Sequence, residues 1–428
     1  MDVTERPSPV HLEDLARPRV APAVAELIAL TDRVARPADL RAHRVCAAAR
    51  SQTGLDDFGA DESFVERLGV ICRSIREEGR LSDVGVLGVF TQLVMYAVNR
   101  LRVEDLVKRH PEVLDLEVRA PIVIAGPPRT GTTHLHQLLA ADPRLRFVPY
   151  WEAMEPVPRT EAMAVRGAED PRIERADAAV ALTDATLPHF KRMHQISTWS
   201  ADEEIHLLAI DASSMIFEVL AHAPSWREYY TSHDQTPHYA YLKKVLQVLQ
   251  YLRGGDRWLL KAPQHTEQFG PLISTFPDAT VVVTHRDPVA ATASLVTMFA
   301  YLARTHSETV DLQELGKYWA TRMVDMLTAC VRDRHLLERD RSIDIRFDDF
   351  MGNELGTLER VFRTAGQPLD SESREAIDCY RVEHPRGLHG GVVYSLAPFG
   401  LDPDELREAM AFYVDAFGLG WEDHDRLR

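Results

Sequence analysis

The feature that most constrains the fold is a short apolar segment that runs directly into a loop of glycine, proline and threonine. Residues 121–126, PIVIAG, are apolar and end in glycine before a proline, which is typical of a buried strand in a parallel sheet. Residues 131–141, GTTHLHQLLAA, then predict a helix that ends before Asp142-Pro143. We therefore expect the intervening loop at the carboxyl end of a strand, where parallel sheets bind ligands.

Further strand-like segments alternate with helical ones along the chain. They are RWLLK (257–261), TVVVTHR (280–286) and SIDIRF (342–347). Strands that alternate with helices predict an α/β fold, with a P-loop-like parallel sheet in three layers flanked by helices. Residues 1–115 predict an N-terminal helical region, which includes a longer buried helix at 86–101. Residues 116–428 are the predicted α/β domain, with a helical, aromatic-rich insertion at about 151–256.

The first loop has the glycine spacing of a nucleotide-binding P-loop, GxxxxGK[ST], with Gly126 and Gly131 as its glycines. Small residues let the backbone wrap an anion, and the following helix directs its N–H groups toward it. Thr132 stands where the motif has its lysine, which argues against cleavage of a triphosphate. Arg129 can supply positive charge. Hydroxyl donors are available from Thr130, Thr132 and Thr133. An ordinary tight turn is the simpler alternative, but it needs neither the arginine nor the threonines.

A second candidate loop follows the segment 280–286. Asp287 predicts a helix cap and Pro288 the first helical residue. Arg286 ends the strand, and Ser294 follows eight residues later, about two helical turns on. Both side chains could therefore face one anion at the mouth of the sheet. Alternatively, Arg286 pairs with a surface acid and Ser294 is a packing residue.

Together the two loops resemble those of sulfotransferases that use 3′-phosphoadenosine 5′-phosphosulfate. The family's phosphosulfate loop, PxxGTT or PRSGTT, appears as Pro128-Arg129-Thr130-Gly131-Thr132-Thr133, and its 3′-phosphate element as Arg286-Asp287-Pro288 with Ser294. The resemblance spans roughly residues 116–400. It is greatest to the bacterial branch, with LLKxPxH at 259–265 and YSLxxFGL at 394–401. Where the cytosolic branch has an R-K-G segment that helps to bind the nucleotide, this chain has Arg386-Gly387 without the lysine.

The resemblance implies sulfuryl transfer to a hydroxyl group, adenosine 3′,5′-bisphosphate as product, and no metal. Transfer needs a base for the acceptor proton and cations for the leaving oxygen. Glu152 is the first candidate base, because protein-tyrosine sulfotransferases carry a glutamate at a comparable place. His265 is the second, by similarity to the cytosolic branch. Lys261 could contact the sulfuryl or bridging oxygen. Alternatively, Glu152 is a helix N-terminal acid and Lys261 a surface lysine.

Composition limits the partners of the chain. A net charge of −16 argues against DNA, RNA or an anionic membrane. The first residues lack the apolar core of a signal peptide, and we expect no stretch of about 18 apolar residues that could span a membrane. We therefore predict a cytoplasmic enzyme without an integral membrane segment. A homo-oligomer is left open. The four cysteines lack the spacing of a zinc site.

Aromatic and apolar residues of the insertion could form an apolar acceptor pocket, or they could simply be core. They are Trp151, Phe190, Met193, Trp199, Phe217 and Trp226. A small acceptor such as a phenol, sterol, polyketide or lipid-like alcohol fits this composition better than a polyanionic sugar. Two rival hypotheses are a P-loop nucleotide kinase or NTPase, and a non-catalytic nucleotide-binding protein of the same fold. The first of these needs the lysine that Thr132 replaces.

Overall fold

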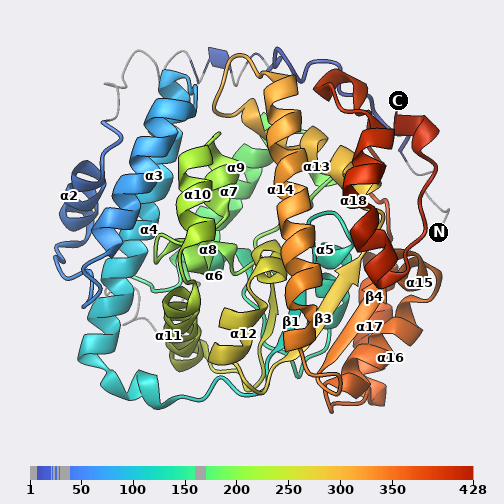
Figure 1. Cartoon of the computed structure of the whole chain (residues 1–428). Coiled ribbons are helices and arrows are strands. Elements are labelled where there is room, and N and C mark those ends of the chain that lie inside the picture. Colours follow the sequence, from blue (N-terminus) through green and yellow to red (C-terminus); the bar gives the residue numbers. More distant parts are fainter. Residues whose placement is uncertain are drawn as a thin grey trace.

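A parallel sheet lies at the centre of the computed structural model, which describes residues 7–20, 22, 25, 26, 28, 39–159 and 170–427 (Figure 1). Within that part of the chain the sheet has four strands in the order β2-β1-β3-β4. They are β1 Ile122–Ala125, β2 Leu259–Lys261, β3 Thr280–His285 and β4 Ser342–Arg346. Each predicted strand is present, and the parallel pairing confirms the predicted α/β fold.

Helices make up most of the other described residues. The α-helices are α2 Ala42–Thr53, α3 Phe64–Glu78, α4 Asp83–Arg109, α5 Thr132–Ala140, α6 Tyr150–Met154, α7 Pro171–Thr186, α8 Ile205–Ala209, α9 Ile216–Leu220, α10 Pro224–Ser232, α11 Thr236–Arg253, α12 Phe269–Thr275, α13 Pro288–Ala303, α14 Leu312–Asp333, α15 Phe347–Gly352, α16 Glu354–Thr364, α17 Ser371–Glu383 and α18 Pro403–Phe417. Short 3-10 helices are η1 Pro111–Asp115, η3 Phe190–Arg192, η4 Pro263–Glu267, η5 Arg334–Leu336, η6 Ala397–Phe399 and η7 His424–Leu427.

The strands are apolar because helices cover both faces of the sheet. Val123 and Val281 point into the larger core, which α11, α13 and α14 share. Ile124 and Val282 point the other way, into a second core with α5, α15, α16 and α17. Alternate residues of one strand therefore serve opposite layers. In Figure 1, α14 lies in front of the sheet, and α16 and α17 lie beside β4.

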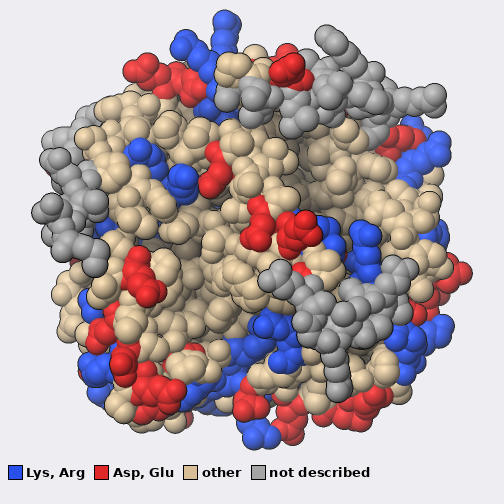
Figure 2. Space-filling model, turned by 180° about the vertical axis from the view of Figure 1, so that it is seen from behind, with Lys and Arg blue, Asp and Glu red and all other residues tan. Residues whose placement is uncertain are grey.

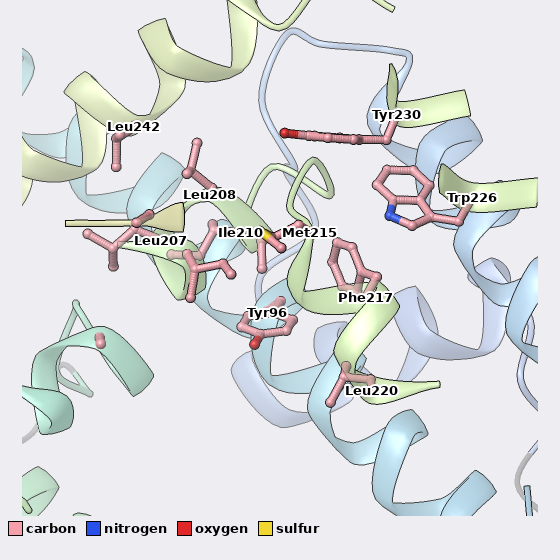
Figure 3. Close-up of a cluster of buried hydrophobic side chains, with 14 of the residues drawn as sticks. Tyr96, Leu207, Leu208, Ile210, Met215, Phe217, Leu220, Trp226, Tyr230 and Leu242 are labelled. Atoms are coloured by element: carbon pink, nitrogen blue, oxygen red, sulfur yellow. The ribbon is translucent and has the colours of Figure 1, made fainter. Parts of the chain in front are cut away.

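The N-terminal helices pack against helices of the segment 151–256, which the sequence analysis predicted as an insertion. Tyr96 of α4 meets Phe217 of α9 edge to face, with ring centroids 6.0 Å apart, and Phe217 meets Trp226 of α10 in the same manner at 5.5 Å. Figure 3 shows these rings among leucine side chains of the same cluster. The helical character predicted for residues 1–115 agrees with α2 to α4, although part of that region lies outside the described residues. The boundary at 115 stays a prediction.

A buried charged cluster joins the same two regions. The Asp211 carboxylate, which follows α8, accepts from Arg67 of α3 at 2.9 Å and from Arg100 of α4. His238 of α11 bonds its other oxygen at 2.6 Å. Arg67 also pairs with the more exposed Asp61 at 2.6 Å. Because these side chains lie inside the protein, the cluster connects α3 and α4 to the insertion through charge as well as apolar contact.

Helix α4 is longer and more apolar than the sequence analysis allowed. By length and composition alone it could cross a membrane, and among the described helices it is the single one of that kind. This corrects the expectation that no such stretch exists. Within its most apolar window, however, 56% of the residues are buried by the rest of the protein. Such burial is typical of a helix in a protein core.

Candidate functional site

A cavity of about 710 Å³ lies beyond the carboxyl ends of β1 and β3. Its walls come from the loop at 129–133, from α5, from the segment 191–201 and from the loop 384–390. Its basic lining residues are Arg129, Lys191, Arg192, Arg286 and Arg386. None of the described residues that line it is Asp or Glu. In a chain of net charge −16, such a local excess of positive charge is typical of a site for a polyanion.

The charges of the chain are unevenly distributed over its surface. Figure 2 shows one face on which acidic and basic side chains are intermixed along the lower part, with further charged side chains near the centre and at the upper edge and uncharged areas between them. The net acidic charge therefore does not exclude a local basic cavity.

The first loop packs tightly against the end of β3. Gly126 has no room for a side chain, since a Cβ there would lie 2.0 Å from Thr284 Oγ1. Thr130 is buried, and its hydroxyl donates to Pro127 O at 2.8 Å and bonds Thr284 Oγ1 at 2.6 Å. Gly131 has a φ of 88° and is the N-cap residue directly before α5. Thr130 and Pro128 therefore support the loop without lining the cavity, whereas Gly131, Thr132 and Thr133 line it.

Arg129 connects the two loops that the sequence analysis singled out. Its Nε donates to Ser294 Oγ on α13 at 2.9 Å, and its Nη1 donates to Met193 O at 2.8 Å. Ser294 is buried and does not line the cavity. The structure thus brings Ser294 to Arg129, where its hydroxyl orients the guanidinium.

Arg286 directly follows β3 and lines the cavity. It also pairs with Glu422, as the alternative interpretation of Arg286 expected. Its Nη1 donates to Arg129 O at 3.2 Å, and its guanidinium stacks on the Phe347 ring at 4.3 Å. Arg386 also lines the cavity, and its Nη1 lies 3.7 Å from Glu354 Oε1. The predicted nucleotide-binding arginines therefore come from separate segments and meet around one space.

Residues 7–10 contact segments that form the wall of this cavity, without lining it themselves. Val10 N donates to Gly391 O at 3.1 Å, and Val393 N donates to Val10 O at 2.9 Å. Arg192, a lining residue, donates through Nη1 to Ser8 O at 3.1 Å. Residues 7–10 therefore hold the basic loop 384–390 in place.

The structure does not bring Glu152 to the cavity. It is 1% exposed, and its two oxygens accept from Arg146 and, at 2.9 Å, from Arg253. A carboxylate held by two guanidinium groups in the interior is not placed to take a proton from an acceptor. The expectation that Glu152 is the base is therefore corrected: it forms a buried ion pair.

His265 is fully buried and does not line the cavity. Its Nδ1 bonds Tyr239 Oη at 2.7 Å, and its Nε2 bonds Glu204 Oε1. Glu204 in turn accepts from the backbone N–H of Lys261 at 2.7 Å through its other oxygen. His265 thus supports the end of β2, where Lys261 lies.

Lys261 pairs with a carboxylate that the sequence analysis missed. Its Nζ donates to Glu203 Oε1, and the Lys261 side chain is 2% exposed against 17% for Glu203. Burial favours a raised pKa for Glu203, but Lys261 and His194 outweigh it and hold the pKa below its usual range. Burial, with help from Lys261 and Arg129, lowers the pKa of His194 to about 4. His194 thus lies within electrostatic reach of both the Glu203–Lys261 pair and Arg129.

The aromatic residues of the insertion divide into two groups. Met193 and the 56% exposed Trp199 line the cavity. Four others are buried in the hydrophobic core and do not line it: Trp151, Phe190, Phe217 and Trp226. The simpler alternative is therefore correct for those four.

Comparison with known proteins gives a consistent family. The model of the sulfotransferase family matches residues 121–371, which include the first loop, Lys261, Arg286 and Ser294. The omega-hydroxy-beta-dihydromenaquinone-9 sulfotransferase Stf3 of Mycobacterium bovis, and that of Mycobacterium tuberculosis, are each 26% identical over 259 residues. The match covers 58% of this chain and 62% of these curated relatives, so the chain spans less than two thirds of their length.

Two solved structures are similar over nearly the whole chain. Sulfotransferase STF9 from Mycobacterium avium has a TM-score of 0.80 and 26% identity, and the match covers 91% of this chain and 99% of that structure. Sulfotransferase STF1 from Mycobacterium tuberculosis H37Rv has a TM-score of 0.75 and 28% identity, covering 88% of this chain and all of that one. Because the uncovered share is about a tenth of the chain, the structural similarity includes at least part of the N-terminal helical region.

Proposed function

Since the chain belongs to the sulfotransferase family, we propose that it moves a sulfuryl group from 3′-phosphoadenosine 5′-phosphosulfate to a hydroxyl of a small apolar acceptor. The observation that supports this most is the basic cavity over the first loop, with five Lys or Arg side chains and no acidic residue among its described lining. A P-loop NTPase is disfavoured, because Thr132 occupies the place of its lysine.

Different residues of the cavity bind different parts of the donor. The phosphosulfate binds at the start of α5, beside Thr132, Thr133 and Arg129. The backbone N–H groups, the hydroxyls and the guanidinium there all favour an anion. Arg286 and Arg386 bind the 3′-phosphate. Ser294 acts through Arg129, whose guanidinium it orients.

The Glu203–Lys261 pair supplies the base and the cation that the transfer needs. The acceptor oxygen forms a bond to sulfur as the bond between sulfur and the bridging oxygen breaks. Glu203 takes the proton of the acceptor hydroxyl, and Lys261 stabilises the charge that develops on the leaving oxygen. Glu203 is the better base than Glu152 or His265, because its side chain is 17% exposed and theirs are buried. Glu203 and Lys261 are not themselves among the lining residues of the cavity, but Ala201, two residues before Glu203, is.

The acceptor carries an apolar body and a hydroxyl. Trp199 and Met193 offer apolar surface beside the cavity. The curated relatives are named for a hydroxylated menaquinone, which is such a molecule. We propose this chemical class, an alcohol on a hydrophobic or aromatic body, as the acceptor, and we expect no nucleic acid partner.

The test is sulfuryl transfer from the labelled donor to hydroxylated quinones and phenols, with ATP and Mg²⁺ as an alternative donor. Glu203→Gln should lower turnover by roughly 10²–10⁴ and leave the affinity for adenosine 3′,5′-bisphosphate unchanged. Glu174→Gln, at an exposed site on α7, is the matched control and should be fully active. Full activity of Glu203→Gln would remove Glu203 from the mechanism, and ADP formation by the wild type would favour an NTPase.

A further inference from the structure

The residues after α18 fold back onto the start of α13, next to the proposed 3′-phosphate site. The backbone N–H of Glu422 donates to Asp287 Oδ2 at 2.6 Å, and His424 Nε2 bonds the same oxygen. Asp287 Oδ1 meanwhile caps α13 by accepting from Val289 N at 2.8 Å. One buried carboxylate therefore anchors both the helix that carries Ser294 and the C-terminal segment that carries Glu422.

The side chain of Glu422 forms a two-point ion pair with Arg286. Glu422 Oε1 accepts from Arg286 Nε at 2.6 Å, and Glu422 Oε2 accepts from Arg286 Nη2 at 3.0 Å. With Nη1 bonded to Arg129 O and the ring of Phe347 under the guanidinium, the plane of Arg286 is fixed from three directions. Such a two-point contact sets the direction of the whole planar group.

The carboxylate lies behind Arg286 and not in the path of a ligand. Arg286 lines both the 710 Å³ cavity and a neighbouring pocket of about 130 Å³. Glu422 lines only the smaller of these two pockets. Asp287, Asp348 and Asp349 line that pocket as well. The Arg286 guanidinium thus forms part of the wall between a basic space and an acidic one.

We propose that Glu422 is a positioning residue that holds Arg286 ready for the 3′-phosphate of the donor. This rests on the proposed function, and it assigns a role to a residue outside the region 121–371 that the family model matches. When the Arg286 guanidinium is already held in place, binding does not lose the conformational entropy that ordering a free arginine side chain would cost. Without Glu422, the affinity for a nucleotide with a 3′-phosphate should fall by about 3- to 10-fold.

The test is calorimetric titration of Glu422→Ala and Glu422→Gln with adenosine 3′,5′-bisphosphate and with adenosine 5′-phosphate. Glu422→Ala should weaken binding of the bisphosphate only, and Glu422→Gln, which keeps one acceptor oxygen, should recover part of the loss. In turnover, Glu422→Ala should raise the KM for the donor and leave kcat unchanged. Glu408→Ala, at an exposed site on α18, is the control.

The outcomes separate the two proposals. If wild type fails to bind the bisphosphate, the proposed function is wrong. If wild type binds it and Glu422→Ala binds it equally well or more tightly, Glu422 does not position Arg286. An equal loss for both nucleotides would also overturn the proposal, because it would show general damage to the cavity. The main-chain contact of Glu422 with Asp287 survives these substitutions, so the segment should stay docked.

Discussion

Removing the charge of Asp211 tests whether the N-terminal helices and the rest of the chain are one cooperative structure. Asp211→Asn keeps the shape of the side chain but leaves the buried guanidinium groups of Arg67 and Arg100 without their shared carboxylate. Breaking a buried ion pair by removing one partner typically costs about 3–5 kcal/mol. Because Asp61 still pairs with Arg67, we expect the lower end, about 3 kcal/mol of unfolding free energy.

The measurement is guanidinium chloride unfolding, followed by circular dichroism and by tryptophan fluorescence. Asp61→Asn is the matched control, since Asp61 is 38% exposed and its loss should cost at most about 1 kcal/mol. Coincident transitions in the two signals would indicate that α3 and α4 unfold with the insertion. A loss below about 1 kcal/mol for Asp211→Asn would refute the reasoning, because the buried cluster would then contribute no more than a surface pair.

Two further predictions concern the site. Arg286→Ala should weaken binding of adenosine 3′,5′-bisphosphate by about 1.5–3 kcal/mol, and Ser294→Ala, which acts through Arg129, by no more than about 1.5 kcal/mol; unchanged affinity in both variants by calorimetry would contradict the assignment. The pH profile of turnover identifies the base: because the pKa of Glu203 is lowered, its proton-accepting form is complete at neutral pH and is lost only as the pH falls below about 4.3, the ordinary glutamate value. An acid limb near 6.5 would instead point to a histidine.

The parts of the fold that could be predicted are those that depend on residues close together in the sequence. PIVIAG and TVVVTHR predicted β1 and β3, and Asp287-Pro288 predicted the start of α13, because strand apolarity and helix caps depend on neighbouring residues. The loops around Arg129 and Arg286 followed, since parallel strands present their carboxyl ends at one edge.

Side-chain partners that are distant in sequence could not be predicted. Glu203 and Lys261 are 58 residues apart, and Arg286 and Glu422 are 136 apart, so no spacing rule joins them. Glu152 had the right residue type, but its role was decided by Arg146 and Arg253, whose positions only the folded chain reveals. The run Ala201-Asp202-Glu203-Glu204, an acidic stretch within an aromatic region, was the signal for Glu203.

The cavity wall draws on segments far apart in the sequence, since residues 7–10 hold the loop before Gly391 and Glu422 holds Arg286. During synthesis on the ribosome, the sheet strands and the first loop emerge well before Glu422 does. The sheet and the hydrophobic cores can therefore form before Arg286 acquires its contact with Glu422. The donor stabilises only a folded form that binds it, so by the proposed role of Glu422 it contributes its full stabilisation only after that segment has docked.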